Sequence, residues 1–350
     1  VHPPIEAVLT VDEEVGMDGA FALDCSDIKG RKLLNLDSEL EGVFTVSCAG
    51  GLHSDCFLPA ESTPVSGMDV FSLTVAGLQG GHSGADIHLG RGSGNRLMGR
   101  TLCTALEKFP GLRLVKFAGG QFDNVICSRC DAVVALPAGT GDDFAAFVRE
   151  FDGILKNEYA VTDPGVTLTC TAASADTAVS AERTATLLRT LVALPQGVEA
   201  MDTDFPGLVQ TSLNMGVTKL DETGLRIRFS IRSSIASRKM MLAQRVRAVI
   251  TLAGGTVTEG GVYPGWQYKR DSQFRDTLLA AYKDLTGKDG VVEATHGGLE
   301  CGLLMEKLPG LDAVSVGPDL FDVHSVRERL NVASTERTYA LVCELLRRSV

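Results

Sequence analysis

The sequence predicts an α/β protein in which a separate α+β unit interrupts an α/β domain, and three observations carry this prediction. Short apolar strands that end in acids or glycines are expected in the first part of the chain and again near its end. Between residues 59 and 261, strand-like runs instead alternate with helical patterns. Pro59 and Pro64 mark the first transition, and the turn-forming residues 263–266 mark the second.

These transitions divide the chain into three segments. Residues 1–58 and 263–350 are expected to form one α/β domain, and residues 59–262 are expected to form the inserted α+β unit. A chain of 350 residues is long enough to bury two cores of this kind.

The opening stretch is expected to carry a site. Residues 5–11 are mostly aliphatic or β-branched, which predicts a buried strand with Asp12, Glu13 and Glu14 at its carboxyl end. Three adjacent carboxylates repel one another, and no Lys or Arg lies within ten residues of them, so a divalent metal is one interpretation. A solvated acidic turn is the other, and this stretch alone leaves both open.

Two further strands are expected before the insertion. Residues 33–36 form a short apolar run that delivers Asp37 at its end, and residues 43–48 run into a glycine turn. The order of strand, acid, strand and glycine turn is typical of a sheet whose carboxyl edge holds a site.

The inserted unit is expected to mix strands and helices. Strands are expected at residues 69–75, 112–117, 132–136, 166–171, 208–215 and 225–231, and helices at 95–106, 142–159, 181–194 and 237–253. His82 lies within the glycine turn 80–84, where the backbone can approach a ligand closely and the imidazole stays exposed. A surface histidine without a role is the alternative.

The last segment returns to the opening pattern. A helix is expected at residues 272–286, strands at 290–295 and 312–316, and a closing helix at 334–348 with Ser334 as its N-cap. His296 to Glu300 would connect a strand to a helix, where backbone N–H groups can hold an anion. A tight connection without a ligand is the alternative.

His324 follows a strand end, where a neutral imidazole could join the acids as a metal ligand.

Composition excludes several classes of partner. The net charge of −11 argues against nucleic acid and anionic membranes as partners, and no apolar run reaches the length of a membrane span. Nine scattered cysteines indicate reduced thiols, so we expect a soluble, cytoplasmic protein. Cys127 and Cys130 have the spacing of a metal clip, but no second pair follows them.

Seven motifs, in chain order, resemble the aminoacyl-histidine dipeptidase (Xaa-His dipeptidase, peptidase D) group of two-zinc metallopeptidases. They are LTVDEE at 9–14, LDSE at 36–39, GGHSG at 80–84, RSS at 232–234, YPGW at 263–266, GLECG at 298–302 and HS at 324–325. The resemblance covers nearly the whole chain. It implies a three-layer αβα catalytic domain of the zinc-peptidase type, interrupted by an α+β lid that also forms a homodimer.

The resemblance also implies a reaction. The expected activity is hydrolysis of dipeptides with a free carboxyl end, of the Xaa-His type, by a water that bridges two divalent metal ions. Zn is the expected metal, with Co or Mn as alternatives. Glu13 matches the general base, and Glu14, Asp37 and His324 match metal ligands.

His82 matches a catalytic residue of the same group, and three further residues match substrate-binding positions. His82, from the lid, would stabilise the oxyanion, and Asn124 would hold the substrate carbonyl. Arg232 would grip the terminal carboxylate, and Gly298 lies in the substrate-binding loop.

The sequence departs from this group in two places. The group's His-x-Asp motif and a later Asp in a glycine-rich stretch, which supply the other metal ligands, have no counterpart in these residues. We therefore expect weak metal binding and a fragment of a longer enzyme. Asn124 is followed by VICSRC, where the group tends to have AIPRE.

The alternatives to a dipeptidase are a non-catalytic fragment that lacks half of the metal site and an amidohydrolase of N-acyl amino acids.

Overall fold

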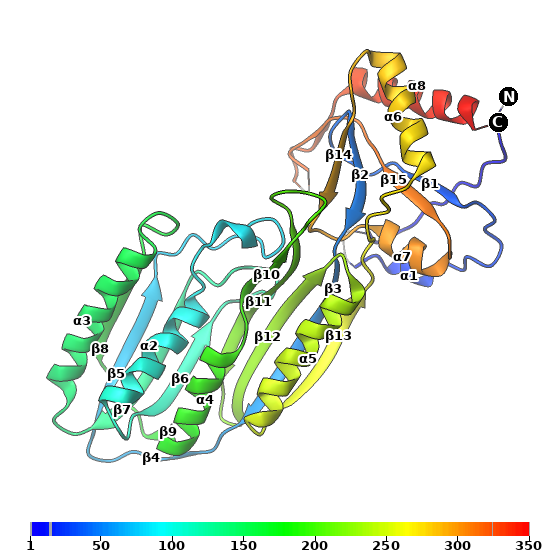
Figure 1. Ribbon diagram of the computed structural model, residues 1–350. Helices are drawn as coiled ribbons and strands as arrows, with labels where there is room; N and C mark the ends of the chain where they lie inside the picture. Colours follow the sequence, from blue (N-terminus) through cyan, green and yellow to red (C-terminus); the bar gives the residue numbers. More distant parts are fainter. Residues whose placement is uncertain (1, 14–15, 324, 350) are drawn as a thin grey trace.

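The chain forms two large sheets, each with its own helices (Figure 1). The computed structural model describes residues 2–13, 16–323 and 325–349. One sheet has four strands, and strands from both ends of the chain build it. The other has nine strands, all from the middle of the chain. This arrangement confirms the expected α/β class with an α+β insertion.

The four-stranded sheet joins the two ends of the sequence. Its strands, in spatial order, are β1 (Lys32–Asn35), β15 (Asp312–Ser315), β2 (Val43–Cys48) and β14 (Val291–Thr295). The outer pairs, β1 with β15 and β2 with β14, are parallel, and the single pairing of β15 with β2 is antiparallel. We call this sheet and its helices the outer domain.

Four helices and a small hairpin complete the outer domain. They are α1 (Asp18–Ala22), α6 (Gln273–Thr286), α7 (Glu300–Lys307), α8 (Val332–Arg348), and the hairpin β16 (Leu320–Phe321) with β17 (Arg329–Leu330). Helices α6 and α8 pack against each other, and α7 contacts α1 and β15. The core between them contains Phe44, Trp266, Leu278, Val314 and Leu341, all buried.

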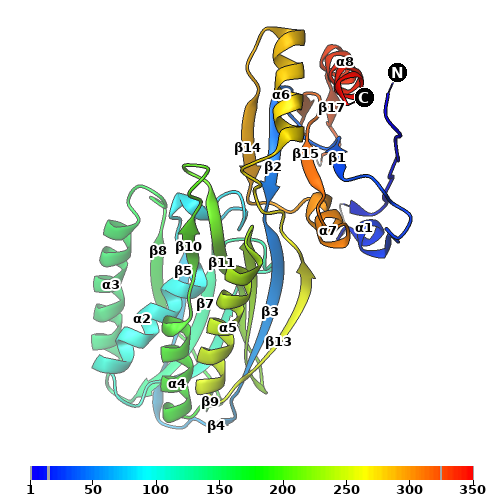
Figure 2. The same cartoon turned by 45° about the vertical axis from the view of Figure 1, so that its right-hand side comes forward.

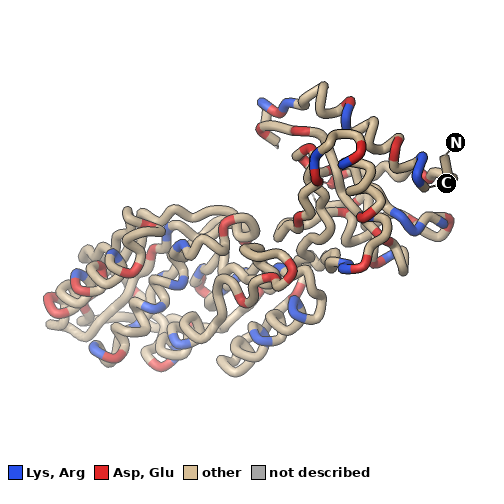
Figure 3. The backbone as a smooth tube through the Cα atoms, turned by 45° about the horizontal axis from the view of Figure 1, so that its top comes forward, with Lys and Arg blue, Asp and Glu red and all other residues tan. Residues whose placement is uncertain are grey.

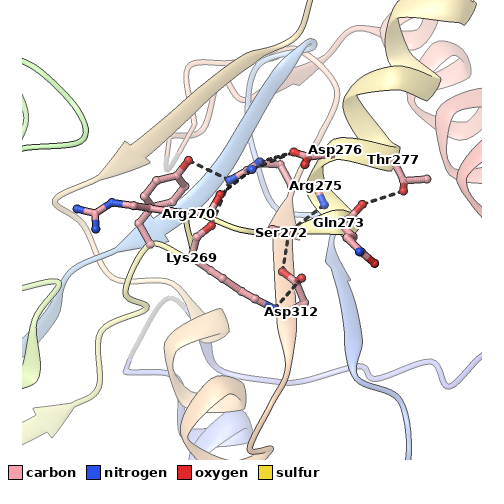
Figure 4. Close-up of polar contacts among 9 residues, drawn as sticks. Lys269, Arg270, Ser272, Gln273, Arg275, Asp276, Thr277 and Asp312 are labelled. Atoms are coloured by element: carbon pink, nitrogen blue, oxygen red, sulfur yellow. Dashed lines mark hydrogen bonds and ion pairs between the residues drawn. The ribbon is translucent and has the colours of Figure 1, made fainter.

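A polar cluster ties the start of α6 to β15 (Figure 4). Ser272 caps the helix, since its hydroxyl accepts a hydrogen bond from the Arg275 N–H at 3.0 Å and donates one to Asp312 at 2.8 Å. Lys269 approaches the other carboxylate oxygen of Asp312 at 2.9 Å. The cap therefore fixes the helix start and its position against the sheet at the same time.

The nine-stranded sheet is the core of the insertion. Its strands run in the order β13 (Thr256–Tyr263), β3 (Gly50–Pro59), β12 (Gly224–Ser233), β11 (Val209–Leu220), β6 (Arg113–Gly119), β7 (Cys130–Pro137), β5 (Met68–Ala76) and β8 (Thr167–Ala172), and β10 (Gly197–Met201) pairs with β11. We call this sheet and its helices the inserted domain. Two short strands, β4 (Ser62–Pro64) and β9 (Thr177–Val179), pair separately.

Four helices cover one face of this sheet (Figures 1 and 2). They are α2 (Gly94–Lys108), α3 (Gly141–Glu158), α4 (Ala181–Ala193) and α5 (Ala236–Leu252), and a short 3-10 helix, η2 (Ile87–Leu89), precedes α2. Alternate residues of β12, such as Ile227 and Phe229, are buried with Leu187 and Leu188 of α4 in one apolar core. The residues between them, such as Arg226 and Arg228, are exposed, because the strand period of two sends them to the opposite face.

The two domains are joined at two adjacent crossings. Cys48 lies on the first crossing and Trp266 on the second, and their backbones exchange two hydrogen bonds of 3.0 Å each. A Cβ at Gly50 would lie 2.3 Å from the Gly265 nitrogen, so only glycine permits this approach. The buried ammonium of Lys239 donates to the carbonyl of Gly51, beside the first crossing, and to the carbonyl of Tyr263, beside the second.

Three details of the sequence prediction are wrong. Because β3 pairs with β12 and β13, the first crossing falls between Cys48 and Gly50 and not after residue 58, and Pro59 ends β3. Residues 5–11 form no strand, and Leu9 is 93 % exposed. The backbone carbonyl of Val11 accepts a hydrogen bond from Gly19 instead of joining a sheet. The side chain that caps α8 is that of Asn331, not Ser334.

Charged residues of both signs are interspersed along the backbone of both domains (Figure 3). Many form surface ion pairs, such as Arg100 with Glu158 and Arg337 with Glu41. Within the described residues, no helix is long and apolar enough to cross a membrane.

Candidate active site

Arg232, one of the expected site residues, lies where the inserted domain meets the loop after β14. Ser212 on β11 and Arg232 on β12 face each other as direct partners in the sheet. The loop that follows β14 brings His296 against them, and the Nε2 atom of His296 lies 2.8 Å from the Ser212 hydroxyl. This contact joins the two domains.

His82 presents one ring nitrogen as a donor. Its Nδ1 accepts hydrogen bonds from the backbone N–H groups of Gly84 at 3.3 Å and Ala85 at 3.1 Å. An imidazole nitrogen that accepts carries no proton, so the proton of the neutral ring resides on Nε2. Partial burial, together with the positive charge of Arg232, lowers the pKa of His82. The residue is therefore a neutral Nε2–H donor at neutral pH.

Asn124 lies beside the His82 loop. Its backbone carbonyl accepts a hydrogen bond of 2.8 Å from the Ser83 N–H, and its side chain is exposed. His82 itself forms an isolated antiparallel bridge with Val125. The structure thus brings His82 and Asn124 together on two paired backbone segments.

Arg232 supplies the positive charge of the site. Its Nη1 donates to the Tyr263 hydroxyl at 3.3 Å, and its Nε is buried without a hydrogen-bond partner among the described residues. A guanidinium with an unused buried donor can still bind an anion, and two parallel N–H groups suit a carboxylate.

His296 is a neutral neighbour of this charge. The residue is only 6 % exposed. Burial, followed by the charge of Arg232, lowers the pKa of His296 to about 3. The site therefore carries the guanidinium charge beside two neutral imidazoles, which favours an anionic ligand group.

Gly298 lies directly against Tyr263. A Cβ at this position would come 2.9 Å from the tyrosine ring, so a side chain here would displace the residue that holds Arg232. The Met17 side chain also approaches Gly298, and it packs with Leu303 and Tyr263 in a small apolar cluster. Met17 follows Glu13 closely in sequence and thereby links the acidic segment to the arginine.

The acidic residues are placed as follows. Glu13 is half-buried in the turn before α1, and its carbonyl accepts from the Met17 N–H at 3.1 Å. Asp37 lies two residues after β1, and its charge adds to the burial that raises the pKa of Cys301 near the start of α7. Glu14 and His324, expected as metal ligands, lie outside the described residues.

The chemistry of the donor atoms suits divalent ions. Asp37 offers an exposed carboxylate, and Glu300, next to Cys301, has a buried Oε1 that accepts no hydrogen bond from the described residues. The other oxygen of Glu300 accepts from the Thr10 hydroxyl at 2.7 Å. Carboxylate oxygens of this kind are ordinary ligands of divalent metals. Among residues 2–13, 16–323 and 325–349, no three His, Cys, Asp or Glu side chains gather closely enough to hold an ion.

Two residues of the site were not anticipated. Ser212 and Asn214 lie in the run 208–215, which the sequence predicts only as a strand. Their spacing of two was the available signal, since it places both polar side chains on one face. That face is the one that meets the Asn124 and His296 loops.

Comparisons with known proteins agree with this arrangement. Residues 73–163, within the inserted domain, match the family model described as the M20 peptidase dimerisation domain. The chain is 37 % identical over 350 residues to the cytosol non-specific dipeptidase of Escherichia coli (strain K12), covering 99 % of this chain and 72 % of that protein. It is 35 % identical, with a TM-score of 0.91, to the crystal structure of aminoacylhistidine dipeptidase from Vibrio alginolyticus, covering 97 % of this chain and 69 % of that one.

These matches identify the class as M20 peptidases. The chain belongs to the aminoacylhistidine dipeptidase family within it. The resemblance inferred from the seven motifs is confirmed.

Proposed function

We propose that this protein hydrolyses dipeptides with a free carboxyl end, including those of the Xaa-His type, in a metal-dependent reaction. The observation that carries the proposal is the placement of the neutral donor His82 close to Arg232, in a chain of the dipeptidase family. One group suits a developing oxyanion and the other suits a terminal carboxylate.

Recognition of the substrate would rest on Arg232 and Asn124. The buried Nε and the outer nitrogens of Arg232 would bind the carboxylate of the dipeptide, while the Asn124 amide would hold its carbonyl. Peptides that lack a nearby free carboxylate would lose the first contact. This selects dipeptides over proteins.

The chemical step would use Glu13 and His82. Glu13 would take a proton from the attacking water and pass it to the leaving amine. The Nε2–H of His82 would donate a hydrogen bond to the carbonyl oxygen as negative charge develops on it, which typically contributes about 3 kcal/mol.

Glu14, Asp37 and His324 would hold two divalent metal ions, and Zn, Co and Mn all suit such a mixed set of carboxylate and imidazole ligands. When bound, the ions would polarise the scissile carbonyl and increase the acidity of water at the site.

We further propose that the protein forms a homodimer through the inserted domain and acts in the cytoplasm. The match of residues 73–163 to the peptidase dimerisation domain supports the first proposal. The relative named as a cytosol dipeptidase supports the second.

The test is an activity assay on the full-length protein loaded with zinc. We expect cleavage of Ala-His, little cleavage of Ala-His amide, and none of N-acetyl-histidine. Glu13→Gln should abolish turnover, and His82→Ala should lower kcat roughly 100-fold to 1000-fold. Preferential cleavage of the acetylated amino acid, or full activity of Glu13→Gln, would refute the proposal.

A further inference from the structure

The Asn214 side chain bonds to the backbone on both sides of Asn124. The residue is 1 % exposed. Its Nδ2 donates to the carbonyl oxygens of Asp123 and Val125, each at 2.8 Å. These two residues flank Asn124, so both N–H groups of one amide hold the backbone on either side of it.

The orientation of the Asn214 amide is itself fixed. Its Oδ1 accepts a hydrogen bond of 3.0 Å from the Gln196 side chain. The carbonyl oxygen of the same Gln196 side chain accepts from the Met215 N–H. A flipped Asn214 would set its oxygen against two carbonyl oxygens, so the network permits only one orientation.

The loop also rests on a bulge in β11. The strand pairing of β11 with β12 shifts between Met215 and Val217, and Gly216 occupies the bulge. A Cβ on Gly216 would lie 2.4 Å from the Cα of Asp123. The loop backbone therefore packs directly on the strand that carries Asn214.

The same backbone reaches His82. Ser83 N–H donates to Asn124 and Ile126 N–H donates to Gly81, both at 2.8 Å, on either side of the His82–Val125 bridge. The two segments thus form a short antiparallel pair. Whatever fixes the loop around Asn124 also fixes the backbone of His82.

We infer that Asn214 is a positioning residue, which holds the Asn124 loop and the His82 loop as one unit in the geometry that the substrate requires. The inference rests on the proposed dipeptidase function for its catalytic consequence. The structural consequence does not depend on the proposed function, because the hydrogen bonds within this unit can be measured without substrate.

The test compares Asn214→Ala and Asn214→Asp with Thr184→Val in the full-length, zinc-loaded protein. Thr184 is an equally buried side chain of the same domain, whose hydroxyl accepts from the Leu114 N–H, and it has no hydrogen bond to either loop. Hydrogen exchange of peptides containing Ser83 and Ile126 should accelerate at least tenfold in both Asn214 variants and stay unchanged in Thr184→Val. The kcat/KM for Ala-His should fall about 10-fold to 100-fold in the Asn214 variants alone.

Each outcome decides one part. Unchanged exchange at the two loops in Asn214→Ala would overturn the inference whatever the activity. Faster exchange with the same kcat/KM as Thr184→Val would overturn the catalytic role. A wild-type protein that cleaves no dipeptide would refute the proposed function and with it the catalytic role, while the exchange rates would still decide whether Asn214 holds the loops.

Discussion

The hydroxyl of Ser212 lies 2.8 Å from the Nε2 of His296. Ser212 belongs to the nine-stranded sheet, and His296 belongs to the loop that continues the four-stranded sheet. Both residues are buried, and Arg232 pairs with Ser212 on the neighbouring strand. One hydrogen bond therefore couples the two domains beside the charge expected to bind substrate.

Ser212→Ala should lower the free energy of unfolding by about 1–2 kcal/mol, because it leaves a buried imidazole nitrogen without its partner. Urea denaturation measures the change. Ser54→Ala is the matched control, since Ser54 is equally buried but its hydroxyl has no hydrogen-bond partner among the described residues. Equal destabilisation by both substitutions would contradict the coupling role of Ser212.

His296 should make stability depend on pH. The unfolded chain binds a proton on this imidazole below about pH 6.5, whereas the folded protein holds the pKa of His296 at about 3. The unfolded state binds more protons than the folded state across this window. The contribution of His296 to the free energy of unfolding is therefore fully present above pH 6.5, and it is lost as the pH decreases from 6.5 towards 3. Between pH 7.5 and 5, the wild type should lose about 2 kcal/mol more than His296→Gln, measured by urea denaturation at each pH. Parallel pH profiles would contradict the assignment.

Tyr263 should influence substrate binding through Arg232. Its hydroxyl accepts from Nη1 of Arg232 at 3.3 Å, so Tyr263→Phe should raise the KM for Ala-His about 2-fold to 10-fold and leave kcat nearly unchanged. Arg232→Lys, which loses the planar pair of donors, should raise KM further. Ala-His amide is the control substrate, because its KM should respond to neither change. A fall in kcat with constant KM would place Tyr263 in the chemical step instead.

Ser272→Ala should destabilise the outer domain by about 1–2 kcal/mol. The substitution removes both the cap of α6 and the hydrogen bond to Asp312. Thermal or urea unfolding measures the loss. Thr277→Val is the control, because that exposed hydroxyl only bonds to a carbonyl within the same helix, and its effect should stay within about 0.5 kcal/mol.

The sequence predicted most elements because their local patterns agree with the fold. The strand expected at residues 43–48 coincides with β2, and the helix expected at 142–159 differs from α3 by a single residue at each end. Residues 5–11 show where the pattern fails. Their composition is typical of a strand, but a strand also requires a partner, and within the described structure the Val11 carbonyl instead accepts a hydrogen bond from Gly19 of α1.

Motifs in the sequence name His82, Arg232 and Gly298, because each lies in a loop or at a strand end with its own local signal. In the structure the charge of Arg232 acts on His82, and Gly298 lies against Tyr263. The roles of these residues stay predictions. No motif names Asn214. Its role depends on the bulge at Gly216, two residues later, and on a loop ninety residues earlier, and the contact with that distant loop cannot be inferred from the neighbouring sequence. The placements of Glu14 and His324 remain predictions.

The two crossings have a consequence for how the protein is made. Lys32 of β1 pairs with Asp312 of β15, so the small sheet closes only after the ribosome has synthesised β15. The nine-stranded sheet is complete at Tyr263, well before that point. During translation the inserted domain can therefore fold while β1 still lacks its partner strand β15, and the early apolar segments of the outer domain stay exposed for that time.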